Sequence, residues 1–363
     1  MEKRPCISVS QLFTILFICR MVMSMTYGPM LIGNVEIWDH IVSSVVAFLA
    51  TFFMVLPIYK LFMSNPKMNL LDNSYDLFGK ASFAVILVYL IYYFLVSAHT
   101  LSVFESFVSN AVNPPISMPL LAMVLLASAC YGAYQGLEAL ARTSGFIMAG
   151  TVLASSLLVV SLLPSIEVIN FKPLLYNGFS SAFCGFKYMI SQSFCLPALA
   201  ALLPLAKGNV KRGIFIWNIA IYLFFIMIIS LIIGSMGDFA STQLFPVYTA
   251  SGIGKFGAMR HLDSVYLGVW MSGIFLKLSV FIFLCGECVK KIFGEKMRNY
   301  IISFCGAVLG IVSLFPDVMD TFHTEFVTSL MFWYVIIIAS VFPLVILILK
   351  QRQLGGRIRK IEK

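Results

Sequence analysis

Charged side chains are scarce in this sequence. Asp, Glu, Lys and Arg together make up 11% of its 363 residues, whereas soluble domains carry roughly 25%. So little charge cannot cover the surface of a water-soluble globule of this length. The apolar residues, 60% of the chain, instead form runs of about 20 residues, the length that crosses a bilayer as a helix. The sequence therefore predicts an all-α membrane protein.

Motifs for catalysis and for metal binding are also missing. The chain has no Gly-rich phosphate loop, no HExxH and no Gly-x-Ser-x-Gly, and its four histidines are not at metal-ligand spacing. The eight cysteines lie mostly in apolar runs, which favours buried free thiols. Cys285 and Cys288 have CxxC spacing but lack a second pair. We therefore expect neither an enzyme nor a bound cofactor or metal.

Ten apolar segments are predicted to be membrane helices. They span 8–32, 40–59, 82–108, 117–134, 143–164, 181–206, 213–236, 264–289, 299–315 and 327–349. The longest loop, 237–263, is expected to be irregular or to hold a short interfacial helix. We interpret residues 1–350 as one polytopic transmembrane domain and residues 351–363 as a basic cytoplasmic tail.

The basic residues predict the orientation of the helices. With the N-terminus in the cytoplasm, only Lys172, Lys255 and Arg260 fall on the outer side, and most Lys and Arg residues fall on the cytoplasmic side. This asymmetry indicates an even number of helices with both termini in the cytoplasm. The net charge of +9 then follows from topology and requires no nucleic-acid partner, although the basic tail is suited to contact anionic lipid.

Three basic residues fall inside predicted spans, where a central charge costs at least about 2.5 kcal/mol. Lys277 is in the middle of the eighth span, too far from either end to reach water. It must face a polar cavity or lose its proton, unless it is a structural pin bonded to backbone carbonyls. Arg20, in the first span, is expected to pair with an acid such as Glu105 or with open carbonyls. Lys187 lies near the outer end of the sixth span and can extend outward.

Two spans carry helix breakers within the membrane. The first contains Thr26-Tyr27-Gly28-Pro29 and the sixth contains the stretch Ser191 to Pro197. Irregular backbone is tolerated at this depth only where it is buried in protein or lines a cavity. Breaks in the first and sixth of ten helices fit two five-helix repeats around a transporter-type site. Tyr92 and Tyr93, in the third span, are either packing residues or part of a ligand wall.

The sequence resembles a known membrane family over nearly its whole length. The matching stretches are Ile7 to Phe13, Gly136 to Arg142, Asn170 to Leu175, Phe245-Pro246, and Leu262-Asp263 with Trp270 and Lys277. They are similar to the B subunit of bacterial spore nutrient germinant receptors, a branch of the amino acid/polyamine/organocation transporter superfamily. In the sixth span, Leu196-Pro197-Ala198 replaces a family glutamate, so a proton-carrying role at this place is not expected.

The resemblance implies a LeuT-like fold, a 5+5 inverted repeat with broken helices 1 and 6 and a ligand between them. Helices 3, 8 and 10 would complete the pocket. The implied ligand-binding residues are Tyr27, Gly28, Pro29, Tyr92, Tyr93, Phe194, Cys195, Leu196, Pro197, Lys277 and Ile336. Sodium-coupled proteins of this fold hold a cation between helices 1 and 8. We hypothesise that Lys277 substitutes for that ion and removes sodium dependence.

The resemblance also implies partners and a function. A B subunit is expected to work in the spore inner membrane with a membrane-embedded A subunit and a lipoprotein C subunit. It would sense a small nutrient, with an amino acid ahead of a sugar or nucleoside, and trigger germination. The alternatives are a proton-coupled amino-acid permease and a purely structural subunit whose pocket is unused. The missing glutamate of the sixth span favours sensing over coupled transport.

Overall fold

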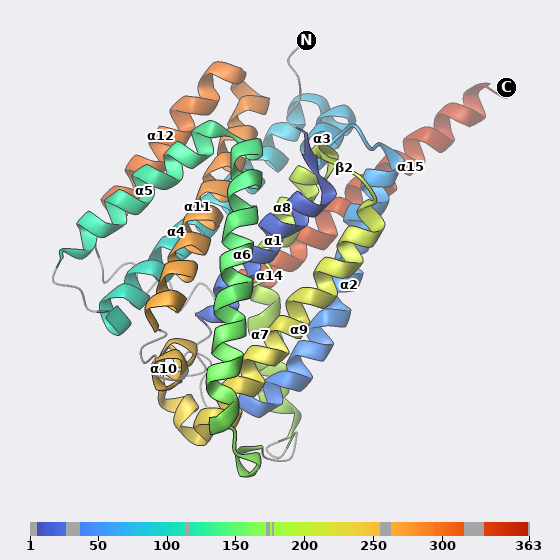
Figure 1. The fold of residues 1–363 in the computed structure, drawn as a ribbon. Helices are drawn as coiled ribbons and strands as arrows, with labels where there is room; N and C mark the ends of the chain where they lie inside the picture. Colours follow the sequence, from blue (N-terminus) through green and yellow to red (C-terminus); the bar gives the residue numbers. More distant parts are fainter. Residues whose placement is uncertain are drawn as a thin grey trace.

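The computed structural model describes residues 6–26, 37–112, 116–171, 175, 178–254, 263–315 and 330–361. Most of these residues are helical, and two short strands, β1 (Ile7–Ser8) and β2 (Ala206–Lys207), pair in parallel. Both β1 and the last turns of α15 lie at one end of the helical bundle, which we call the terminus end (Figure 1). The opposite end, where α10 lies, is called the loop end.

The chain forms a series of helices that reaches from α1 to α15. Their bounds are α1 (Val9–Met25), α2 (His40–Ser64), α3 (Leu70–Phe78), α4 (Ser82–Phe107), α5 (Met118–Gln135), α6 (Leu137–Leu162), α7 (Phe179–Ser191), α8 (Cys195–Leu202), α9 (Val210–Met236), α10 (Pro246–Ile253), α11 (Asp263–Phe293), α12 (Glu295–Val312), α14 (Met331–Ile336) and α15 (Phe342–Ile361).

Each of the ten predicted membrane segments contains helix, and the predicted all-α membrane protein is confirmed. Eight spans in the described part of the chain are long and apolar enough to cross a membrane. The other two predicted segments correspond to α1, which has 17 residues, and to α12, whose first turns carry Glu295, Lys296 and Arg298. Figure 1 shows α12 running alongside α5. The 5+5 inverted repeat remains a prediction.

Two features go beyond the prediction from sequence, α3 and the length of α15, whereas the short helix in the loop 237–263 agrees with it. Helix α3 precedes the third span and begins with a capping box, in which Asn69 accepts from the Asp72 N–H at 2.7 Å and Asp72 accepts from the Asn69 N–H at 3.2 Å. The loop 237–263 contains a 3₁₀ turn, Gly237–Thr242, and the short helix α10. Helix α15 continues through most of the predicted tail, to Ile361.

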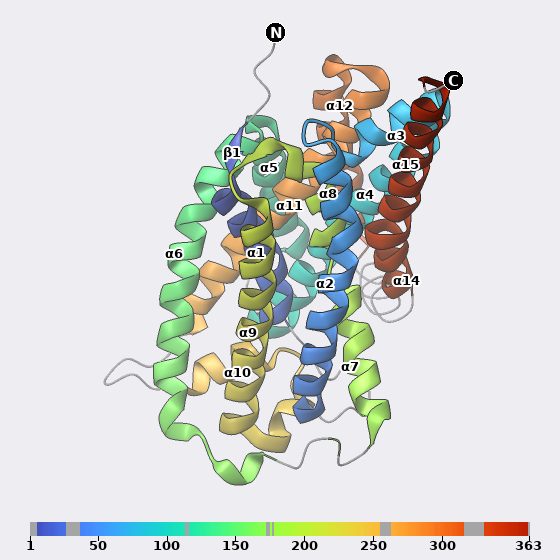
Figure 2. The same cartoon turned by 90° about the vertical axis from the view of Figure 1, so that its right-hand side faces the viewer.

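Helix α1 runs through the interior of the bundle, behind α9 and between α6 and α2 (Figure 2). Small residues allow its neighbours to approach closely. A Cβ atom added at Gly273 of α11 would lie 2.4 Å from the Val22 Cγ2 atom of α1. Likewise, one added at Gly132 of α5 would lie 2.9 Å from the Ser279 hydroxyl of α11. These glycines hold α1 and α5 against α11.

The Gly273→Ala substitution is expected to lower the free energy of unfolding by about 1–3 kcal/mol, because the stiff Val22 side chain cannot yield to the new methyl group. Gly268→Ala on the same helix is the matched control, since a Cβ atom there meets no atom within 4 Å. The control should be neutral or stabilising by up to about 1 kcal/mol. Thermal unfolding of the purified full chain measures both, and equal stability of the two variants would contradict the close packing of α1 on α11.

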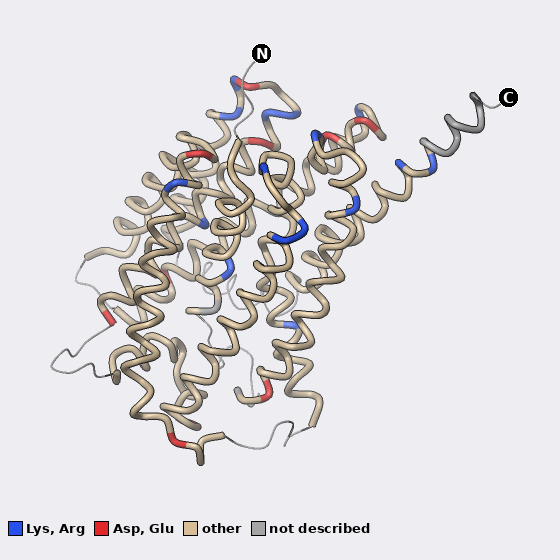
Figure 3. The backbone as a smooth tube through the Cα atoms, turned by 45° about the vertical axis from the view of Figure 1, so that its right-hand side comes forward, with Lys and Arg blue, Asp and Glu red and all other residues tan. Residues whose placement is uncertain are grey.

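Basic residues of the described chain gather mainly at the terminus end, while acidic residues lie at both ends (Figure 3). The two ends therefore differ in charge, as the sequence predicts. The termini lie at the more basic end, which agrees with the expected topology. That this end faces the cytoplasm remains a prediction.

Candidate functional site

The sixth span is broken in the middle. Helix α7 ends at Ser191 and α8 begins at Cys195. Pro197 has no N–H to donate to the Ser193 carbonyl, four residues earlier, which removes one helical hydrogen bond and favours a break at this point. The Leu196 N–H donates to that carbonyl instead, at 3.2 Å. The break predicted in the first span falls on Tyr27, Gly28 and Pro29, which lie outside the described residues.

Arg20 of α1 caps the end of α7. Its Nη2 atom donates to the Met189 carbonyl at 2.7 Å, and the Ser193 hydroxyl donates to the same oxygen at 3.0 Å. The last carbonyls of a helix lack internal partners and carry partial negative charge, which a guanidinium stabilises. Of the two partners expected for Arg20, the structure shows a carbonyl. The Glu105 carboxylate accepts from the Ser313 hydroxyl.

Tyrosine side chains of α4 form hydrogen bonds with the backbone of the broken span. Tyr92 donates to the Phe194 carbonyl at 3.2 Å, and Tyr93 donates to the Pro197 carbonyl at 3.0 Å. Positions three and four apart share one face of a helix, so Tyr89 joins them. The candidate residues Tyr92 and Tyr93 therefore hold the backbone at the start of α8.

The tenth span meets the same tyrosine face through a π-helical turn, Ile337–Val341. Tyr89 donates to the Ile338 carbonyl at 2.7 Å, and the Tyr334 ring stacks on Tyr92 at 6.3 Å between centroids. Single π-turns in membrane helices often occur at functional sites. The sequence prediction chose Ile336, which is half-buried on this span, whereas these contacts with α4 come from Tyr334 and Ile338.

Lys277 of α11 is fully buried beside the break. Its Nζ atom lies 4.5 Å from the centroid of the Phe194 ring. In the described part of the chain this ammonium has no hydrogen-bond partner. A desolvated cation–π contact contributes about 2 kcal/mol, less than the several kcal/mol that burying the charge costs. None of the carbonyls that the structure describes accepts from Lys277, so the carbonyl-bonded pin that the sequence left open is not seen among these residues.

The surroundings of Lys277 come from α1 and from the start of α8. The Cys19 and Cys195 thiols contact each other, and both interact electrostatically with the lysine, as does Arg20. Arg20 is also buried, and its Nη1 atom has no hydrogen-bond partner among the residues the structure describes. Two buried cationic groups with unused donors thus share one region.

Several of the predicted site residues come together here. They come from α4, from α8 with the residue before it, and from α11, and all are buried: Tyr92, Tyr93, Phe194, Cys195, Leu196, Pro197 and Lys277. The CxxC pair is elsewhere in α11, where Cys285 contacts the Leu90 carbonyl and the Cys305 thiol. All eight cysteines are free thiols, as the sequence predicts.

A cavity of about 590 Å³ leads from the terminus end to the tyrosine face. Tyr93 lies at its deep end, and its rim carries charged residues of α3, α11 and α12. Ion pairs cross this rim, between Lys291 and Asp72 and, at 3.2 Å, between Arg298 and Glu287. The sequence prediction missed this cavity. The clustered charges at the end of α11 and the start of α12 were its only signal.

Aromatic rings close the site toward the loop end. Trp270 lies two turns before Lys277 on α11 and is fully buried. Its ring is 4.2 Å from that of Phe107 and 6.3 Å from that of Phe104, with which it stacks. Phe107 in turn contacts Phe245 near α10 at 4.9 Å. Among the described residues, the cavity thus reaches Tyr93 from the terminus end, and packed aromatic rings lie on the loop-end side of Lys277.

Comparisons with known proteins agree with this architecture. A family model described as "Spore germination protein" matches residues 6–321. Spore germination protein XB of Bacillus anthracis is 24% identical over 242 residues, which cover 63% of this chain and 66% of that protein. The match thus extends over just under two thirds of that relative's length.

Proposed function

This chain belongs to the spore germination protein family, and from its site we propose that it is the nutrient-sensing subunit of a germinant receptor. It binds a small nutrient between α1, α4, the α7–α8 break and α11, and passes the signal to other subunits. The partners are a membrane-embedded A subunit and a lipoprotein C subunit in the spore inner membrane. Both termini of the chain face the cytoplasm.

The observation that carries this proposal is the unpartnered ammonium of Lys277. A buried charge without a hydrogen bond is costly, and an anion beside it removes that cost. The carboxylate of an amino acid supplies the anion, with Arg20 and the positive end of α8 nearby. The aromatic rings of Phe194 and Tyr92 suit the apolar part of such a ligand. We therefore favour an amino acid over a sugar or nucleoside.

The direct test uses spores whose only germinant receptor contains this chain. These spores are exposed to single amino acids, sugars and nucleosides, and germination is followed by loss of optical density. A response to one or a few amino acids is expected, because the site offers a carboxylate partner. Germination by sugars or nucleosides alone would contradict the proposed ligand class, and an unchanged response after Phe194→Ala would contradict the site.

Binding is expected to be independent of sodium, because Lys277 already supplies a positive charge next to α1. Titration of the activating amino acid into the purified full chain, in sodium or in potassium buffer of equal ionic strength, measures this. The two dissociation constants should agree within about twofold. Tighter binding in sodium would overturn the hypothesis that the lysine replaces an ion.

The second candidate function is an amino-acid permease, favoured by the cavity that reaches Tyr93 from the terminus end. A sensor of external nutrients needs no path from the site to the terminus end, which faces the cytoplasm in this proposal. Uptake of the labelled activating amino acid into proteoliposomes separates the two functions. Accumulation driven by a proton gradient supports the permease, and binding without accumulation supports the sensor.

A further inference from the structure

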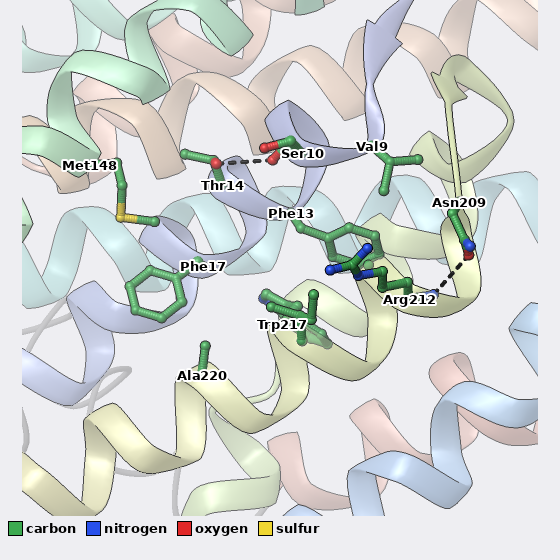
Figure 4. Close-up of a pocket in the computed structure, with 12 residues that line it drawn as sticks. Val9, Ser10, Phe13, Thr14, Phe17, Met148, Asn209, Arg212, Trp217 and Ala220 are labelled. Carbon is green, nitrogen blue, oxygen red and sulfur yellow. Dashed lines mark hydrogen bonds between the residues drawn. The ribbon is translucent and has the colours of Figure 1, made fainter.

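A second cavity lies on the side of the bundle, outside the candidate site. It has a volume of about 310 Å³ and is formed by α1, α6 and α9. Figure 4 shows Asn209 and Arg212 at one end of this groove and Phe17, Met148 and Ala220 at the other. The walls are mostly apolar, and the polar groups are concentrated at the terminus end.

The dimensions of the groove match one leaflet of a bilayer. From Asn209 to Ala220, α9 rises about 16 Å at 1.5 Å per residue. One leaflet contributes about 15 Å of hydrocarbon, half of the bilayer core. The groove begins where α9 begins, and its length therefore suits a lipid whose head lies at that end and whose acyl chain reaches the bilayer centre.

The floor of the groove is shaped by close contact between α1 and α9. A Cβ atom added at Gly213 would lie 2.4 Å from the Phe13 ring, so the glycine lets this ring pack against the α9 backbone. The Phe13 and Trp217 rings are 6.0 Å apart. Trp217 is 5% exposed, and in the described chain its Nε1 atom has no hydrogen-bond partner. A buried donor without a partner needs an acceptor, which a water molecule or a ligand in the adjoining groove can supply.

The polar end of the groove is positive. Arg212 is exposed and forms no ion pair with any residue that the structure describes. Lys207 and Lys211, also exposed, precede it at the same end of α9. The positive end of the α9 macrodipole adds to their field. An occupant with an anionic head and an apolar tail complements both ends of the groove.

We propose that this groove binds an anionic phospholipid from the leaflet at the terminus end. The lipid phosphate contacts the Arg212 guanidinium, and an ester carbonyl accepts from the Trp217 Nε1 atom. One acyl chain lies along Phe13 and Phe17 as far as Ala220. This lipid site is separate from the nutrient site, and it stands whether or not the chain senses nutrients.

The test measures which lipids the full-length protein retains. The protein is reconstituted in vesicles of equal parts phosphatidylglycerol and phosphatidylcholine, released in mild detergent, and analysed by native mass spectrometry. Wild type is expected to retain phosphatidylglycerol preferentially. Arg212→Gln should reduce that preference about fivefold, the effect of one basic residue at a charged membrane surface.

Two further variants make the test specific. Lys211→Gln removes a neighbouring charge whose side chain does not line the groove, so it should reduce the preference clearly less than Arg212→Gln does. Ala220→Phe fills the apolar end and should reduce retained phosphatidylglycerol severalfold, even though Arg212 is intact. The proposal is overturned if Arg212→Gln behaves as wild type, if Lys211→Gln loses as much preference as Arg212→Gln, or if Ala220→Phe retains as much lipid as wild type.

Discussion

Replacing Lys277 with methionine is expected to weaken the nutrient response about tenfold to a hundredfold, while the fold stays at least as stable as wild type. The ligand loses a charge-assisted hydrogen bond, worth about 1.5–3 kcal/mol. The substitution also removes a buried cation to which no described residue is hydrogen-bonded. Replacing such a cation by an apolar residue of similar length usually leaves the stability of the fold unchanged or raises it. Germination dose response and thermal unfolding of the purified chain measure the two effects separately.

The control is Lys187→Met. Lys187 is half-buried on α7 with its ammonium 5.2 Å from the Phe183 ring centroid, so it is a membrane cation outside the site. Its replacement should shift the half-maximal nutrient concentration by less than about twofold. A Lys277→Met variant that loses stability and response together would show that the lysine is structural, and the ligand role would have to be abandoned.

Truncating Trp270 to alanine is expected to lower the free energy of unfolding by about 3–5 kcal/mol, the range for large aromatic residues in packed interiors. Trp270 is fully buried between Phe104 and Phe107, so its removal leaves a cavity in the aromatic layer. The same truncation at Trp333, which is 64% exposed on α14, should change stability by less than about 1 kcal/mol. Denaturation of the purified chains in the same detergent gives both values.

The removal of Trp270 should also open the site toward the loop end. Cysteine-reactive reagents added from that side should then label Cys195 faster than in wild type, because the ring no longer blocks the way. Equal stability of the Trp270→Ala and Trp333→Ala proteins would contradict the packed aromatic layer.

The sequence predicted the elements of the site from strong local signals. Lys277 was recognisable because a charge in the centre of an apolar span is costly. The break near Pro197 was recognisable because proline has no N–H to donate within a helix. Both signals are read from neighbouring residues, so they need no knowledge of the tertiary structure.

The contacts between helices could not be predicted in the same way. The Tyr92 hydroxyl donates to Phe194, which is 102 residues away, and Arg20 donates to Met189, which is 169 residues away. Such pairs depend on how α1, α4 and α7 pack, and periodicity within one helix carries no information about its neighbours. The cavity at the terminus end was missed for this reason, since its rim joins Asp72 to Lys291, 219 residues apart.

The start of helix α3 is marked in the sequence by a helix-capping motif that the prediction of membrane spans did not include. Asn69 and Asp72 form a capping box at the spacing that marks helix starts. The segment is short and only moderately apolar, so a search for membrane-spanning runs passes over it. The capping residues mark where this helix begins, although they carry no information about its contact with the basic end of α11.

The central claim is that Lys277 receives the carboxylate of the nutrient. Its most direct test is the equilibrium binding of the activating amino acid and of its carboxamide analogue, each to purified wild type and Lys277→Met. The wild type should prefer the carboxylate by at least about tenfold, and the variant should bind both compounds alike. The same preference in both proteins would contradict the claim, because the lysine would then not distinguish the charged group from the neutral one.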